Sequence, residues 1–189
     1  MVILEIVLAH LLGDFVFQSN DLILKKYKTW RGTLEHVCII ATFTALFLFP
    51  YWQHNETWMV VGIIFATHFV QDVLKVEYDA RYNQKKKSTA PFFLDQILHL
   101  SLIVYLSTYF NNLEPLTLPN WVEELYFSKY LVTFWIGLVL FSYTFDITRY
   151  QFKRKHSKKG LQYHPDFPGI VKRLLLFSIA YVLFLLLFL

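Results

Sequence analysis

The sequence predicts an all-α fold, namely a polytopic membrane protein built as a bundle of about six transmembrane helices. First, 56% of its 189 residues are hydrophobic and only 17% are charged, whereas soluble domains carry about 25% charged residues. Second, apolar runs long enough to span a bilayer recur along the whole chain. Third, lysine and arginine gather in alternate connections between these runs, as is typical of multi-pass proteins.

The apolar runs define six expected helices within a single transmembrane domain covering residues 1–189. The first run is short for a span, has no basic segment before it, and is interpreted as a retained helix rather than a signal peptide. Ser88, Thr89 and Pro91 mark the start of the fourth helix, since a hydroxyl cap and a proline favour a first turn. The expected helices cover residues 2–18, 33–52, 58–76, 90–110, 127–150 and 169–189.

The distribution of positive charge predicts the orientation of the bundle. Basic loops follow the first, third and fifth helices, whereas residues 53–57 and 111–126 hold no lysine or arginine. By the positive-inside rule the three basic loops are cytoplasmic and both termini lie outside. The net charge of +4 is therefore explained by topology, and we expect no nucleic-acid partner. Contact with membrane lipids, including anionic headgroups at the basic loops, is the expected interaction.

Three pairs of histidine and aspartate share one spacing. His10/Asp14 and His68/Asp72 are four residues apart, and a third pair, Asp95/His99, has the reverse order. Side chains four residues apart on an α-helix lie on nearly the same face, one turn along. Each pair therefore presents an imidazole and a carboxylate together.

The predicted topology brings these pairs to one depth. All three, and His36 in the first turn of the second helix, fall in the cytoplasmic halves of their helices, while the outer halves are almost purely apolar. An ionisable side chain within a span costs about 2.5–3.5 kcal/mol on insertion scales, so such groups usually face the bundle interior and pair. The sequence therefore predicts a polar layer beneath the cytoplasmic surface.

Zinc and other divalent first-row metals bind to imidazole nitrogen and carboxylate oxygen atoms. The single cysteine, Cys38, excludes a thiolate cluster. The candidate ligands are enough for two or three bridged ions, or for one ion whose histidines are oriented by carboxylates. A divalent metal, zinc first, is the expected cofactor, and Asp14, Asp72 and Asp95 are also candidate catalytic groups. The seven candidate ligands are His10, Asp14, His36, His68, Asp72, Asp95 and His99.

Asp146, Arg149 and Arg173 are candidate substrate-binding residues, because arginine matches the oxygens of an anionic group bidentately. Asp146 and Arg149 also have the spacing of a structural salt bridge. His156 and His164, in the third cytoplasmic loop, are within reach of the mouth of the site. The His/Asp pairs themselves have an alternative role as interhelical hydrogen-bonding contacts, although three pairs at one depth favour metal.

Three segments resemble the bacterial family catalogued as domain of unknown function 3307: residues 9–18 (AHLLGDFVFQ), 68–75 (HFVQDVLK) and 93–99 (FLDQILH). The resemblance covers about the first 110 residues and implies a multi-pass protein of the bacterial inner membrane, without an established activity. The first two His-x-x-x-Asp pairs are also similar, more distantly, to those of zinc-dependent phospholipases C and related nucleases, and of a family described as inner-membrane metal-dependent hydrolases. The chain lacks the His-x-x-x-Glu pair and the ligating N-terminal tryptophan of the phospholipase group.

These observations lead to three functional hypotheses. The first is a membrane-embedded metal-dependent hydrolase with its His/Asp site near the cytoplasmic face, acting on a phosphoester or a lipid headgroup. The second is a transporter or a conduit for protons or metal, for which polar residues would be spread through the whole membrane. The third is a non-catalytic interaction module whose His/Asp pairs are polar contacts between helices.

Overall fold

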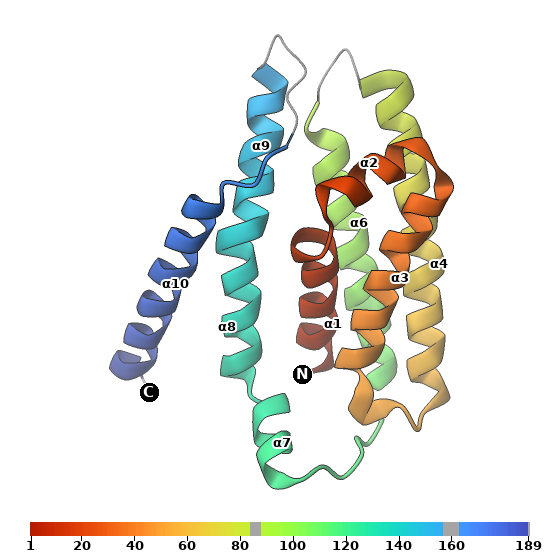
Figure 1. Ribbon diagram of the computed structural model, residues 1–189. Coiled ribbons are helices and arrows are strands. Elements are labelled where there is room, and N and C mark those ends of the chain that lie inside the picture. The colour runs from red at the N-terminus through yellow and green to blue at the C-terminus, as the bar shows by residue number, and fades with distance from the viewer. Residues whose placement is uncertain (84–87, 157–162, 189) are drawn as a thin grey trace.

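The computed structural model describes residues 1–83, 88–156 and 163–188, and within these ranges the chain forms helices and no strands. Parts of the basic runs after the third and fifth expected helices, residues 84–87 and 157–162, lie outside the described residues, as do the side chains of Lys155 and His156. Figure 1 labels the main helices. In chain order the elements are α1 (Val2–Leu11), η1 (Leu12–Val16), α2 (Asn20–Lys28), α3 (Trp30–Phe47), η2 (Phe49–Tyr51), α4 (Asn55–Tyr78), η3 (Asp79–Asn83), α6 (Ala90–Ser107), η4 (Thr108–Phe110), α7 (Asn120–Tyr126), α8 (Lys129–Val139), η5 (Leu140–Thr144), α9 (Phe145–His156) and α10 (Phe167–Phe188).

The long helices run side by side, and both termini lie at the same end of the bundle (Figure 1). The opposite end carries α2, the last turns of α4 and α9, and the first turn of α6. We call this the basic end, because its described residues include Lys25, Lys26, Lys28, Arg81, Lys153 and Arg154. The turn between α3 and α4, and the helix α7, belong to the end that holds the termini.

The all-α membrane architecture is confirmed. Four segments are long and apolar enough to cross a membrane, and the bent pair formed by α1–η1 and α2 brings the number to five if it counts as one span. The helix α3 is not in this set, and its first two turns carry Arg31, Glu35 and His36. The four segments are Asn55–Tyr82, Ala90–Phe110, Lys129–Arg154 and Phe167–Leu187.

The connection between the first two expected helices differs from the prediction of a basic loop. The chain bends by 86° after η1 and forms the amphipathic helix α2. Ser19 caps this helix by accepting a hydrogen bond from the Leu22 amide at 3.2 Å, which satisfies a free backbone donor. A Cβ at Gly32 would collide with the backbone of Lys25, so glycine allows α3 to start directly against α2.

Other boundaries shift for local reasons. The helix α3 starts at Trp30, three residues earlier than expected, because Thr29 caps it through the Gly32 amide. The helix α6 begins at Ala90 as expected, where the Ala90 amide donates to Ser88 Oγ at 3.2 Å. The connection from 111 to 126 contains the short helix α7, and the expected helix over 127–150 extends through α9 to His156.

The helix α1 lies at the centre of the bundle, where it contacts α3, α6 and α8. Its apolar side packs into a core with Ile40, Val60 and Ile103, each at most 1% exposed. A Cβ at Gly13 would collide with the Ile40 side chain, so this glycine permits close packing of η1 on α3. The central position of α1 and η1 brings His10 and Asp14 between three neighbouring helices.

Candidate metal centre

All seven predicted ligands meet in one buried cluster toward the basic end. They come from α1 and η1, from the first two turns of α3, from the last turns of α4 and from the first three turns of α6. Each is between 0% and 9% exposed. The spacing of four residues explains the convergence, because it keeps both members of each pair on the inward face of one helix.

Asp14 and two histidines form the centre of the cluster. The Nε2 atom of His36 lies 3.1 Å from Asp14 Oδ1 and 3.2 Å from the Nε2 atom of His68. The Nε2 atom of His68 is itself 3.5 Å from Asp14 Oδ1. Three groups with lone pairs therefore face one small region from three separate helices, which is the arrangement that a shared cation requires.

The second half of the cluster is built from stacked imidazoles. The rings of His68 and His99 stack with their centroids 4.0 Å apart, and the ring of His10 lies 5.1 Å from that of His99. Among the described residues, neither Nε2 of His10 nor Nε2 of His99 has a hydrogen-bond partner, although carboxylate oxygens of Asp14 and Asp95 lie at 3.6 and 3.3 Å. Buried polar atoms are normally satisfied, so these two nitrogens are free to act as ligands.

The ligand atoms fall into three groups in which every atom lies within 4.8 Å of the others. His68 belongs to two of these groups, and so does Asp72. A carboxylate can bridge two metal ions, and sharing of this kind is typical of centres with more than one ion. The three groups are His10/Asp14/His68, His36/His68/Asp72 and Asp72/Asp95/His99.

Two lysines outside the predicted site residues, one buried and one partly exposed, hold the carboxylates. Lys26 Nζ from α2 lies 2.6 Å from Asp72 Oδ2, and Lys75 Nζ from α4 lies 2.6 Å from Asp95 Oδ2. The spacing of Lys75 three residues after Asp72 was a usable signal for a lysine at this depth. Lys26 could not be assigned from sequence, because its place depends on the bend before α2.

Two amides complete the surroundings of the cluster. Gln96 Nε2 donates to Asp14 Oδ2 at 2.9 Å, and the Gln18 amide lies 3.1 Å from His36 Nδ1. Such contacts fix the orientation of ligand side chains. Both glutamines stand inside the segments 9–18 and 93–99, so those motifs already contained them.

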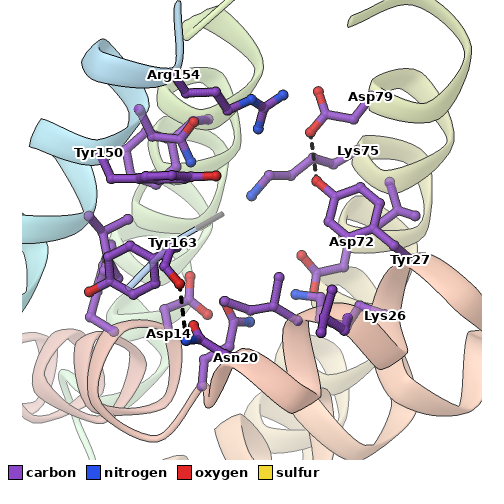
Figure 2. A pocket seen from close by; sticks show the side chains of 18 of the residues that line it. Asp14, Asn20, Lys26, Tyr27, Asp72, Lys75, Asp79, Tyr150, Arg154 and Tyr163 are labelled. Atoms are coloured by element: carbon purple, nitrogen blue, oxygen red, sulfur yellow. Dashed lines mark hydrogen bonds and ion pairs between the residues drawn. The ribbon is translucent and has the colours of Figure 1, made fainter. Parts of the chain in front are cut away.

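A cavity of about 650 Å³ opens beside the cluster at the basic end. Asp14 and Asp72 form part of its wall, so the cavity borders the candidate ligands directly. Figure 2 shows Lys26, Lys75 and Arg154 around it, together with Tyr27, whose hydroxyl donates to Asp79 Oδ2 at 3.0 Å. His164 also lines the cavity, in agreement with its expected reach.

The three predicted substrate-binding residues lie together beside α10. Asp146 Oδ1 pairs with Arg173 at 3.3 Å, and Asp146 Oδ2 accepts a hydrogen bond from the Tyr163 hydroxyl at 3.0 Å. Arg149, which is exposed, lies 3.6 Å from Asp166. These contacts fix the segment before α10, and Tyr163 connects them to the cavity, whose wall it forms in part. Burial, together with the hydrogen bond to Asp146, raises the pKa of Tyr163 above its ordinary value.

The half of the bundle away from the basic end was expected to be apolar, but it contains one buried acid. Glu5 of α1 is 1% exposed, and its two carboxylate oxygens have no hydrogen-bond partner among the described residues. Its neighbour Ile6 belongs to the apolar core. A single acid in an apolar run gives no periodic signal, so no sequence pattern indicates its role.

The fold and the cluster define the class of this protein, an α-helical membrane protein with a buried centre of histidine and aspartate. The chain belongs to the family described as protein of unknown function DUF3307, whose model matches residues 2–125. The matched region contains all seven candidate ligands and the two lysines that pair with Asp72 and Asp95, and ends before α8. No curated protein and no solved structure matches the chain.

Proposed function

We propose that this chain is a metal-dependent hydrolase of the bacterial inner membrane that acts on a phosphoester at the cytoplasmic face. One observation carries the proposal: seven buried histidines and aspartates converge in three overlapping groups beside a cavity. Interhelical polar contacts alone need no such convergence of many groups at one place, because each is a hydrogen bond between two helices. The excess of ligand atoms, and their access to a cavity, favour a centre that binds metal and substrate.

The donor set suits zinc, because imidazole nitrogen and carboxylate oxygen are its usual ligands outside thiolate sites. A divalent ion at this place would polarise a phosphoryl oxygen and supply a nucleophile at neutral pH. The chain contributes orientation: Lys26, Lys75 and Gln96 each hold one carboxylate in place. Asp146 and Arg173 contribute at the rim by fixing the Tyr163 hydroxyl.

The proposed orientation follows from charge. Six crossings, with α3 as the sixth, leave both termini on the same side of the membrane. The positive-inside rule then places the basic end in the cytoplasm and both termini outside. The 18 residues of α3 give a helix of about 27 Å at 1.5 Å per residue, which is close to the hydrocarbon thickness. Its polar first turns would then lie at the cytoplasmic boundary beside the cavity.

The test is hydrolysis of p-nitrophenyl phosphate and its bis-ester by protein purified in nanodiscs. Removal of metal by a chelator is expected to abolish the rate, and added zinc or manganese to restore it. His68→Ala is expected to lower the rate at least about 100-fold, on the scale of losses at metal centres. His54→Ala, at the opposite end of the bundle, is the matched control. An unchanged rate after both chelation and His68→Ala would contradict the proposal.

Glu5 favours a second candidate, a conduit for protons or metal. This acid places one buried polar group between the termini and the His/Asp cluster, in a region that was expected to be apolar. Proteoliposomes would distinguish the two functions. A conduit predicts zinc-driven or proton-driven flux that Glu5→Gln reduces, whereas a hydrolase predicts activity in detergent and no flux.

A further inference from the structure

We propose that the cavity at the basic end binds a phosphate group and that Arg154 is the side chain that recognises it. This assignment deepens the proposed function, on which it rests for the reaction that the bound phosphate undergoes. It concerns a residue outside the region that the family model matches. It also differs from the substrate-binding set suggested by sequence, which lies beside α10.

Three cationic side chains from three helices converge on this cavity. Lys26 comes from α2, Lys75 from α4 and Arg154 from α9, and all three line it. In Figure 2 the Arg154 guanidinium extends across the top of the cavity toward the α4 side, where Lys75 and Asp79 lie. Cationic donors that converge from separate helices suit an anion with several oxygens better than a carboxylate with two.

Ion pairing distinguishes Arg154 from the two lysines. Asp72 pairs with Lys26 and Asp95 pairs with Lys75, each at 2.6 Å. Arg154 forms no ion pair or hydrogen bond with another residue in the part of the chain that the structure describes. Its five donors are therefore available, and a planar guanidinium presents them in the geometry that a phosphate accepts.

The position of the cavity is consistent with a phosphate ester as ligand. Its wall reaches the metal-ligand candidates Asp14 and Asp72 on one side and Arg154 on the other. A volume of about 650 Å³ is in the usual range for a small-molecule site. Apolar side chains from η1, α6 and α9, namely Phe15, Phe92 and Ile147, complete the wall. A phosphate held by Arg154 would thus lie beside the carboxylates, with apolar surface for the group that it esterifies.

The same phosphate chemistry can come from a soluble ester or from a lipid headgroup. Three probes separate these sources: inorganic phosphate, glycerol phosphate and dihexanoyl phosphatidic acid below its micelle concentration. Calorimetric titration into the purified protein gives the affinity of each. A lipid source predicts that phosphatidic acid binds at least about tenfold more tightly than glycerol phosphate, and a soluble source predicts similar affinities.

The decisive comparison uses two neighbouring basic residues of α9. Arg154→Gln is expected to weaken binding of every probe about tenfold or more, the scale of a lost charge-assisted hydrogen bond. Lys153→Gln, at the exposed neighbouring position and outside the residues that line the cavity, is expected to leave the affinities within about twofold. Arg154→Lys keeps the charge and is expected to restore part of the affinity, which guards against a loss caused by misfolding.

Metal content, measured on the same samples, separates this inference from the proposed function. Arg154→Gln is expected to bind as much metal as the wild type. Binding that depends on Arg154 in a protein without metal would support the anion site and overturn the hydrolase. Equal affinities in Arg154→Gln and wild type, or no binding of any probe to the wild type, would overturn the anion site.

Discussion

The ion pair between Lys26 and Asp72 allows the balance of buried charge to be tested directly. The side chains are 9% and 3% exposed, and Nζ and Oδ2 are 2.6 Å apart. Lys26→Met removes the cation and leaves Asp72 without its nearest positive charge, while Asp72→Asn leaves the lysine uncompensated. Removing one partner of a buried pair typically costs about 3–5 kcal/mol, whereas neutralising both is often close to neutral.

The two substitutions are therefore expected to be strongly coupled in their effect on the free energy of unfolding. Each single variant should lower the free energy of unfolding by about 3–5 kcal/mol, or the melting temperature by about 6–20 °C for a chain of this size. The double variant Lys26→Met/Asp72→Asn should melt near the wild type. Thermal unfolding in detergent after chelation measures the ion pair without a contribution from metal.

The matched control is the pair Lys25–Glu35, which starts from the neighbouring residue of α2 and joins this helix to α3 at the surface. Its atoms are 2.9 Å apart, but its side chains are 58% and 52% exposed. Water screens exposed ion pairs, so they contribute little to stability, and Lys25→Met/Glu35→Gln should show little coupling. If the Lys26/Asp72 double variant instead lost the sum of the two single losses, the assignment of a compensated buried pair would be refuted.

Three further predictions concern single positions. Gly32→Ala should lower the melting temperature by several degrees, because its Cβ collides with the Lys25 backbone; a neutral effect would show that α2 shifts freely. Glu5→Gln should leave the melting temperature unchanged or raise it, since it removes a carboxylate without a hydrogen-bond partner among the described residues, and a loss above about 1 kcal/mol would reveal a hidden partner. The pKa of Tyr163 is raised above 10.0 by burial and by the hydrogen bond to Asp146, so its contribution to stability should be present below about pH 10 and be lost as pH rises further. Ultraviolet difference titration against Tyr163→Phe should show this late ionisation, and an ordinary one would contradict it.

The convergence of the candidate ligands could be predicted because two independent patterns agree. The spacing of four residues pairs an imidazole with a carboxylate on one helix face, and the alternation of basic loops gives His10, His68 and His99 a common depth. The structure brings these residues together with His36, whose place in a first turn was itself inferred from topology. Helical periodicity and the distribution of charge were therefore enough to predict most residues of the candidate site.

The groups that hold the cluster in place were less accessible to sequence reasoning. The position of Lys26 depends on the 86° bend before α2, which no local pattern in residues 12–19 indicates. Arg154 belongs to a basic run, and every residue of that run could serve only to keep the loop on the cytoplasmic side. Only the folded chain shows that Arg154 lines the cavity. Tertiary contacts decide such cases, because the same lysine or arginine suits a loop, a lipid interface or a buried pair.

The central claim is that the His/Asp cluster binds metal. Metal analysis by mass spectrometry on protein purified without added chelator tests it most directly. We predict at least one equivalent of a divalent ion, zinc first, with a loss of most of it in His68→Ala and full retention in His54→Ala. A wild-type protein that is folded, contains no stoichiometric metal and takes up none from added zinc would contradict the claim.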